Sequence, residues 1–273
     1  MKKIYVNFKR FDIPKEYGGV NSLYPIDLWA GNIIKDLDGV LEGYEDTEFT
    51  FLFPESHLLK ALEEKPSHIK IGSQGVYRKD VAKGGNFGAF TTFFPPAAAS
   101  AMGAKATLIG HCEERNNYKE LIKKARGDEK VLHEFLNESV KGALARGLDV
   151  LFAIGESADE QANWKEVLKE QIDLGLKDVD RSKVTLAYEP VWAIGPGKTP
   201  PDKAYIEKIA DFIKEETGGL DLVYGGGLKA DNAKMLASID NIDGGLIALT
   251  RFSGDIGFYP EEFLEIVNIY RGV

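Results

Sequence analysis

Short apolar runs recur along the chain, and most are followed by segments whose apolar residues are spaced as on one face of a helix. The runs are rich in β-branched and aromatic residues and do not alternate with polar ones, which is typical of strands buried on both faces. We expect strands near residues 4–8, 48–53, 68–76, 105–110, 150–154, 184–187, 220–224 and 245–249. We expect helices near residues 26–37, 56–62, 95–102, 129–145, 231–238 and 260–270, others opening near 159 and 199, and one before 129.

Strand and helix alternate without a shift in composition and without a linker. This alternation predicts a parallel sheet covered by helices, and eight units in about 250 residues is the size of a closed (β/α)8 barrel. A doubly wound open sheet is the alternative, but the first strand is not followed by the Gly-x-Gly-x-x-Gly turn of that fold. We therefore expect a single α/β domain over residues 1–273, folded as a closed (β/α)8 barrel.

Composition and charge narrow the functional classes. Hydrophobic residues make up 44% of the 273 positions, which is enough to form a core. The net charge of −9 argues against non-specific nucleic-acid binding but not against a small anionic ligand. No apolar run is long enough to span a membrane, and the start of the chain does not resemble a signal peptide. A lone cysteine, Cys112, leaves no internal disulfide and fits the cytoplasm.

Chemically useful residues gather at the predicted carboxyl ends of the strands, where barrel enzymes carry their active sites. In chain order these are Asn7 and Lys9, His111 and Glu113, Glu189, the glycine run 225–227, and Arg251. A carboxylate shielded from water is a stronger base and suits removal of a proton from a carbon beside a carbonyl. A histidine and a lysine can then stabilise the oxygen of the resulting enolate. Free N–H groups of the glycine run, leading into a helix with its dipole, suit a phosphate. The set predicts an isomerase of a small phosphorylated carbonyl compound that needs no metal and no cofactor.

The segment from Ala187 to Pro200 holds the carboxylate and a covering segment. Pro190 ends the strand directly after Glu189, and Val-Trp-Ala-Ile follows before a Gly-Pro-Gly turn at 195–197. Apolar residues between a proline and a glycine turn predict a lid with a hinge at each end. The alternative is an ordinary strand–loop–helix connection with a packed Trp192.

Each candidate also has an ordinary interpretation when it is taken alone. A single histidine such as His111 is more often packed or solvent-facing, Lys9 is typical of a surface charge, and three glycines can form a simple turn. Their common position on one predicted rim favours function. The remaining histidines show no metal-ligand spacing and are interpreted as structural or surface residues: His57, His68 and His133.

Four motifs resemble those of the triosephosphate isomerases. Ala-Tyr-Glu-Pro-Val-Trp-Ala-Ile-Gly-x-Gly-Lys-Thr at 187–199 resembles the family's catalytic-glutamate and lid motif. Ile-Gly-His-Cys-Glu at 109–113 resembles Ile-Gly-His-Ser-Glu, Asn-Phe-Lys at 7–9 resembles Asn-Trp-Lys, and Tyr-Gly-Gly-Gly at 224–227 resembles Tyr-Gly-Gly-Ser. The resemblance covers nearly the whole chain. It implies a TIM barrel of glycolysis and gluconeogenesis that interconverts dihydroxyacetone phosphate and glyceraldehyde 3-phosphate through an enediolate.

The resemblance also implies roles for matching residues. Glu189 would be the base, His111 a neutral electrophile, and Lys9 the cation that holds substrate and enediolate. The supporting residues would be Asn7 beside them, Glu113 positioning Lys9, and Gly195 and Gly227 donating N–H groups to the phosphate. The loop that contains Thr91 would reach into a partner subunit. The expected partners are therefore a phosphorylated sugar substrate and a second copy in a homodimer, with no nucleic acid and no membrane.

The chain departs from the family near the expected phosphate. Ala248-Leu249 replaces the family's Gly-Gly after the eighth strand, and we hypothesise that Arg251 contacts the anion instead. Residues 14–25 form a longer first loop, Glu114 replaces an arginine, and Phe93 replaces a glutamate. Three functions stay open: triosephosphate isomerase, an isomerase of a related sugar phosphate such as a tetrulose phosphate, and a non-catalytic sugar-phosphate-binding paralogue. The base and its partners argue against the last, because binding alone needs no base.

Overall fold

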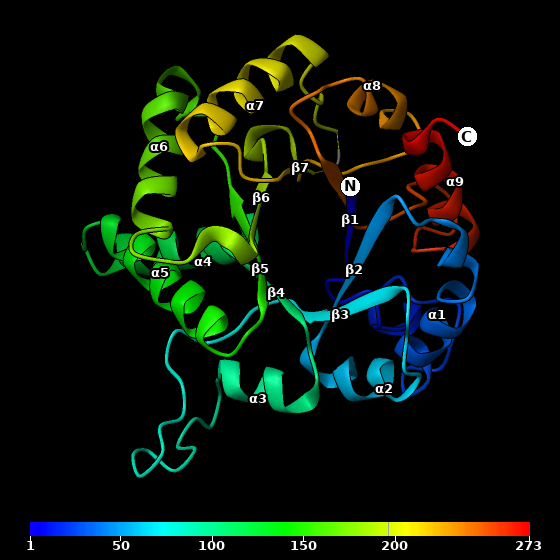
Figure 1. Ribbon diagram of the computed structural model, residues 1–273, viewed down its shortest axis with the longest axis horizontal. Coiled ribbons are helices and arrows are strands. Elements are labelled where there is room, and N and C mark those ends of the chain that lie inside the picture. The colour runs from blue at the N-terminus through cyan, green and yellow to red at the C-terminus, as the bar shows by residue number, and fades with distance from the viewer. Residues whose placement is uncertain (196) are drawn as a thin grey trace.

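Eight parallel strands close into one barrel, in the order β1 to β8, with helices around its outside (Figure 1). The computed structural model describes residues 1–195 and 197–273. The strands are β1 (Lys2–Asn7), β2 (Thr47–Phe53), β3 (Ile69–Ser73), β4 (Ala106–Ile109), β5 (Asp149–Ile154), β6 (Val184–Tyr188), β7 (Leu222–Tyr224) and β8 (Gly244–Ile247). The closed (β/α)8 barrel is confirmed, and the doubly wound alternative is wrong.

Nine α-helices lie in the described part of the chain. They are α1 (Trp29–Leu37), α2 (Leu58–Glu63), α3 (Pro96–Met102), α4 (Cys112–Lys124), α5 (Lys130–Ala145), α6 (Trp164–Gly175), α7 (Lys203–Thr217), α8 (Ala233–Ala237) and α9 (Pro260–Arg271). Among residues 1–195 and 197–273, none of these helices has the length and apolarity needed to cross a membrane.

Apolar side chains fill both sides of the barrel wall. Tyr5, Leu108 and Val223 belong to a cluster of inward-facing residues, whereas Ile4 and Val6 pack with the surrounding helices. Successive strand residues point to opposite faces, so a strand buried on both faces is mostly apolar. This double burial explains why the strands are largely apolar runs in the sequence.

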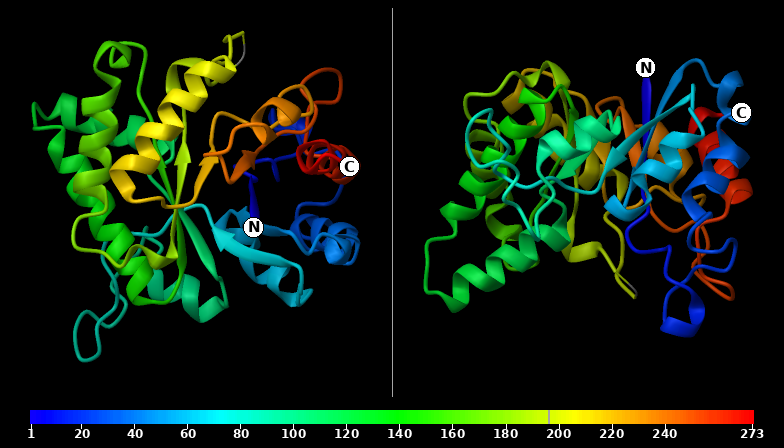
Figure 2. Two further views of the ribbon diagram at one scale, coloured as in Figure 1. Left: turned by 45° about the horizontal axis from the view of Figure 1, so that its top comes forward. Right: turned by 90° about the horizontal axis from the view of Figure 1, so that it is seen from below.

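The loops that follow β1, β6 and β8 extend from the same end of the barrel (Figure 2, right). The longer first loop is tied to the loop after β8, since Lys15 Nζ donates to Asp255 Oδ1 at 2.7 Å and the Ser22 and Tyr259 hydroxyls lie 3.0 Å apart. The segment between β3 and α3 instead projects away from the barrel (Figure 1, lower left). One end of the barrel thus gathers the strand ends with their loops.

Several helices begin a few residues later than the sequence pattern suggests. The helix after the glycine run, expected near residue 231, begins at Ala233, whose N–H donates to the Lys229 carbonyl at 2.9 Å. The helix after the predicted lid begins at Lys203 rather than near Thr199, with the Asp202 carboxylate accepting the Tyr205 N–H at 2.8 Å as its cap.

Candidate active site

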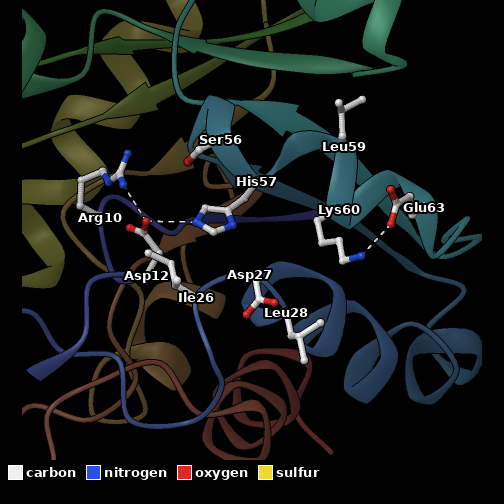
Figure 3. A pocket seen from close by; sticks show the side chains of 10 residues that line it. All are labelled: Arg10, Asp12, Ile26, Asp27, Leu28, Ser56, His57, Leu59, Lys60 and Glu63. Atoms are coloured by element: carbon white, nitrogen blue, oxygen red, sulfur yellow. Dashed lines mark hydrogen bonds and ion pairs between the residues drawn. The ribbon is translucent and has the colours of Figure 1, made fainter.

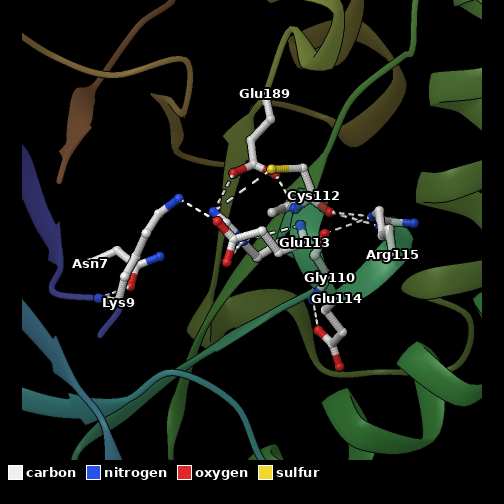
Figure 4. Close-up of polar contacts among 10 residues, drawn as sticks. Asn7, Lys9, Gly110, Cys112, Glu113, Glu114, Arg115 and Glu189 are labelled. Atoms are coloured by element: carbon white, nitrogen blue, oxygen red, sulfur yellow. Dashed lines mark hydrogen bonds and ion pairs between the residues drawn. The ribbon is translucent and has the colours of Figure 1, made fainter. Parts of the chain in front are cut away.

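Glu189 is the buried carboxylate at the centre of the strand ends (Figure 4). It directly follows β6, its own N–H donates to the Ile154 carbonyl at 2.8 Å, and the residue is only 1% exposed. Its Oε2 accepts the Cys112 N–H at 2.8 Å. Within the described part of the chain its Oε1 accepts no hydrogen bond. Burial raises the pKa of Glu189 to about 8, although the Cys112 N–H and the charge of Arg115 oppose the rise.

His111 faces this carboxylate from the start of α4. Its Nδ1 accepts the Glu113 N–H at 3.3 Å, so the proton of the neutral ring lies on Nε2, which approaches Glu189 Oε1 to 3.4 Å. Burial and the charge of Lys9 lower the pKa of His111 to about 4, with Glu113 acting in the opposite direction. The imidazole is therefore neutral near pH 7 and presents an N–H donor.

Lys9 lies just beyond the end of β1 with a left-handed backbone, at φ 42°. Two side chains hold this strained residue: Asn7 Oδ1 accepts its N–H at 3.0 Å, and Gln74 Nε2 donates to its carbonyl at 2.9 Å. Its Nζ donates to Glu113 Oε1 at 2.5 Å, and this contact lowers the pKa of Glu113 against the effect of burial. The structure thus brings Asn7, Lys9 and Glu113 together beside His111.

Glu156 is a fully buried carboxylate that sequence reasoning left without a role. It follows β5 closely, and its Oε1 accepts from Tyr188 Oη at 2.9 Å, Trp192 Nε1 at 2.8 Å and Tyr205 Oη at 3.0 Å. Trp192 belongs to the predicted lid, in the short 3-10 helix Val191–Ala193. Glu156 therefore joins the lid to β6 and α7. Its position after a buried strand was the signal that could have identified it.

Glu114 and Arg115 support the turn between β4 and α4. Glu114 is not a solvated charge: its carboxylate accepts the Gly110 N–H at 2.7 Å, and burial raises its pKa. The buried Arg115 donates from Nε to the Gly110 carbonyl at 2.7 Å and from Nη2 to the Ala153 carbonyl at 2.7 Å. These bonds fix the backbone that carries His111.

The expected phosphate ligands lie apart from these contacts. The Gly225 N–H is already used by the Tyr188 carbonyl at 2.6 Å, whereas in the described part of the chain those of Gly226 and Gly227 donate no hydrogen bond. Gly195 has the positive φ of 119° that favours glycine, and Pro196 of the predicted turn lies outside the described residues. Arg251 Nε donates to Glu262 Oε1 at 2.6 Å, and its guanidinium stacks 3.7 Å above the Tyr259 ring.

A cavity of about 530 Å³ opens between the first loop and α2, and Glu189 does not line it (Figure 3). Its buried Asp12 accepts from Arg10 Nη2 at 2.6 Å and lies 3.0 Å from His57 Nε2. The contact agrees with the structural interpretation of His57.

Comparisons with known proteins agree with the fold and the motifs. The family model described as triosephosphate isomerase matches residues 30–270. The triosephosphate isomerase of Lactobacillus delbrueckii subsp. bulgaricus is 34% identical over 224 residues, which cover 77% of this chain and 79% of that protein. The one from Chloroherpeton thalassium is 34% identical over 215 residues, or 74% and 76% of the two chains.

A crystal structure of triosephosphate isomerase from Bartonella henselae matches 99% of both chains with a TM-score of 0.71 and 23% sequence identity, a likeness of fold. The family model covers the segments that carry His111 and Glu189, and the two relatives cover 77% and 74% of the chain. This chain therefore belongs to the triosephosphate isomerase family.

Proposed function

We propose that this chain interconverts dihydroxyacetone phosphate and glyceraldehyde 3-phosphate by proton transfer through an enediolate. The observation that carries the proposal is the buried Glu189 carboxylate, 3.4 Å from the Nε2 of a neutral imidazole. Burial strengthens the carboxylate as a base, and the lowered pKa of His111 keeps that ring a donor rather than an imidazolium. Membership in the family supports the same reaction.

In this mechanism the Glu189 carboxylate removes a proton from the carbon beside the substrate carbonyl. The electron pair of that C–H bond forms the carbon–carbon double bond of the enediolate, and negative charge develops on the carbonyl oxygen. The His111 Nε2–H and the Lys9 ammonium stabilise this oxygen. The hydroxyl group on the carbon that lost the proton passes its own proton, through the His111 imidazole, to the former carbonyl oxygen. Glu189 then returns the first proton to the former carbonyl carbon, which completes the exchange of ketone and aldehyde.

The remaining residues hold these groups in place. Asn7 and Gln74 fix the backbone of Lys9, and Glu113 pairs with its ammonium. Gly195 and Gly227 are our proposed N–H donors to the phosphate. Arg251 reaches the phosphate in this proposal only by leaving Glu262.

The proposal is tested by assaying purified protein for interconversion of the two triose phosphates, with Glu189→Gln and the exposed Glu166→Gln as a matched pair. We expect Glu189→Gln to lower kcat by about 10³-fold, because it removes the base, and Glu166→Gln to change it little. Triose turnover that survives Glu189→Gln would exclude the mechanism.

A second candidate, an isomerase of a larger sugar phosphate such as a tetrulose phosphate, is favoured by the loop after β8. Side chains of Ala248 and Leu249 stand where the family has Gly-Gly, and the loop is held by Thr250 and Arg251 N–H groups that both donate to the Gly257 carbonyl at 3.1 Å. Tetrulose phosphates therefore belong in the same assay. Turnover of these compounds at a higher kcat/KM than the trioses would favour the second candidate.

We also propose that the chain forms a homodimer through the segment between β3 and α3. This segment projects from the barrel and exposes Phe87 by 91% and Phe93 by 52%, with Phe93 stacked on Tyr77 at 3.9 Å between ring centroids. Exposed aromatic residues on a projecting loop are suited to burial against a second copy.

Sedimentation velocity tests this assembly. We expect a dimer for the unmodified chain and a monomer for the double variant Phe87→Asp/Phe93→Asp, while Leu121→Asp, another exposed apolar residue, stays dimeric. A monomeric unmodified chain, or a double variant that remains dimeric, would contradict the proposal. The free Cys112 fits the cytoplasmic location that we propose with it.

A further inference from the structure

The thiol of Cys112 has no part in the proposed reaction, in which only its N–H is used. It lies beside the Glu189 carboxylate (Figure 4), and its Sγ is 3.9 Å from His111 Nε2. His111 Nε2 is 3.4 Å from Glu189 Oε1, and all three atoms lie within 4.8 Å of one another. A nitrogen, a sulfur and an oxygen thus face one small space.

These separations fit a tetrahedral metal ion. With zinc–ligand bonds of about 2.3 Å to sulfur and about 2.0–2.1 Å to nitrogen and oxygen, tetrahedral angles place nitrogen and oxygen about 3.3 Å apart and nitrogen and sulfur about 3.5 Å apart. The observed nitrogen–oxygen separation already has this value. The sulfur has to approach the nitrogen by about 0.4 Å and the oxygen by up to about 1.3 Å.

The oxygen of this set is also unoccupied by other contacts. Glu189 is 99% buried, and within residues 1–195 and 197–273 its Oε1 accepts no hydrogen bond, whereas Oε2 holds the Cys112 N–H. A buried carboxylate oxygen that accepts no hydrogen bond lowers the stability of the folded chain. A cation between Oε1, Nε2 and Sγ removes that cost.

We propose that His111 Nε2, Cys112 Sγ and Glu189 Oε1 bind a zinc ion, which inhibits the enzyme. Two anionic ligands, a thiolate and a carboxylate, balance the charge of Zn²⁺, and nitrogen and sulfur ligands favour zinc over magnesium or calcium. The ion binds the lone pairs of Glu189, the proposed base, and of His111, the proposed electrophile, so neither group can act on the substrate. Zinc and catalysis are therefore mutually exclusive at this site.

Proton balance defines what binding changes. The thiol releases its proton to solvent when sulfur binds the metal, and a protonated Glu189 releases its proton when Oε1 binds. The imidazole proton moves from Nε2 to Nδ1, which breaks the 3.3 Å bond from the Glu113 N–H and leaves the new Nδ1–H facing Glu113 Oε2, 3.9 Å away. A water molecule completes the fourth position.

Cobalt(II) gives a direct readout that needs no catalytic activity, so failure of this proposal and failure of the proposed function are distinguishable. Metal-free protein is titrated with Co²⁺, and we expect a thiolate-to-cobalt charge-transfer band in the near ultraviolet that saturates at one equivalent and disappears when Zn²⁺ is added. Cys112→Ser and Cys112→Ala should lack the band. His68→Gln, which removes a histidine outside the set, should keep it.

Inhibition by zinc is measured in parallel, with each variant's rate divided by its own rate in the presence of a chelator. We expect both Cys112 variants to need at least tenfold more zinc for half inhibition, and His68→Gln to behave as the unmodified chain. The absence of a thiolate band in folded, unmodified protein would overturn the site. Equal zinc sensitivity of the Cys112 variants and the unmodified chain would overturn the inhibition.

Discussion

At the scale of single residues, Glu189 links the proposed reaction to stability. Burial raises its pKa from 4.5 to about 8, so between these values the folded chain keeps a proton that the unfolded chain has released. Stability from this group is complete below the unfolded pKa and is lost as pH rises through the folded pKa. The carboxylate that suits proton abstraction therefore opposes folding at neutral and alkaline pH.

Glu189→Gln should consequently stabilise the chain, and by more as pH rises from 4.5 to 8. The amide stays neutral, so we expect little difference at pH 4.5 and a gain of about 1 kcal/mol or more at pH 8, because one pKa unit corresponds to about 1.4 kcal/mol. Urea unfolding of both proteins across this range measures the effect. A difference that does not change with pH would show that the buried carboxylate is not the source, and Glu166→Gln is the matched control.

The site residues divide into those that the sequence predicts and those that it does not. Lys9, His111 and Glu189 follow strands directly, so counting strands was enough to bring them to one rim. Gln74 has no predicted role, because its hydrogen bond to the Lys9 carbonyl depends on the unusual Lys9 backbone at φ 42°, which no sequence pattern predicts. The burial of Glu114 was likewise missed, because a charged residue in a first helical turn is normally solvated.

At the scale of elements, the predicted lid is attached to the barrel through Glu156, whose backbone carbonyl also accepts the Val191 N–H at 3.1 Å. Glu156 Oε1 accepts from Trp192 on the lid, from Tyr188 in β6 and from Tyr205 in α7. The Trp192 and Tyr205 rings also meet edge to face, 5.6 Å apart. The lid therefore shares the Glu156 carboxylate oxygen with β6 and α7.

Removing different donors to Glu156 should separate local from global effects. Trp192→Phe should increase protease cleavage within residues 191–200 with little change in the free energy of unfolding, because the lid can detach alone. Tyr188→Phe should lower that free energy by about 1–3 kcal/mol, because its hydroxyl lies in the buried wall. Limited proteolysis and urea unfolding measure the pair. If both variants changed protease cleavage and the free energy of unfolding in the same way, the lid would unfold only together with the barrel.

Element types were predictable here, whereas some element starts were not. The apolar runs define the eight strands because double burial leaves few polar positions in them. The helix near Ala233 begins slightly later than its sequence pattern, since residues 229–232 form a turn in which Asn232 Oδ1 accepts the Lys229 N–H at 2.8 Å. Asparagine and lysine are compatible with both the turn and a first helical turn, so sequence alone did not distinguish them.

At the scale of the whole molecule, barrel closure depends on a close approach between β8 and β1. A Cβ at Gly244 would overlap the backbone carbonyl oxygen of Lys3, to which Gly244 is paired. Backbone atoms on a paired strand have little room to move. The absence of a side chain at Gly244 is therefore a condition for closing the barrel in this register.

Gly244→Ala should lower the free energy of unfolding by about 3 kcal/mol, because the new methyl group would clash with backbone atoms that cannot move aside easily. Gly43→Ala, where a Cβ meets nothing within 4 Å, is the matched control and should stay within about 1 kcal/mol. Denaturant unfolding followed by circular dichroism compares them. Similar free energies of unfolding for the two variants would mean that β1 and β8 can move apart enough to accommodate the extra methyl group.

The barrel as a whole followed from the number and spacing of apolar runs, but contacts between distant loops did not. The ion pair of Lys15 with Asp255 joins the first loop to the last, across almost the full length of the chain. Both residues are ordinary surface charges in the sequence. Only the closure of β1 on β8 brings their loops together.

That closure also sets the order in which a ribosome can complete the molecule. Of the eight strands, β1 is synthesised before the others, yet one of its two edges pairs with β8. Both edges of the strand Lys2–Asn7 are therefore covered only after residue 247 has been synthesised. A nascent or prematurely ended chain exposes this edge together with Ile4 and Val6, which are buried in the finished barrel. Open apolar edges pair readily with other chains. During translation the first strand made is thus a point at which chaperones would be expected to act.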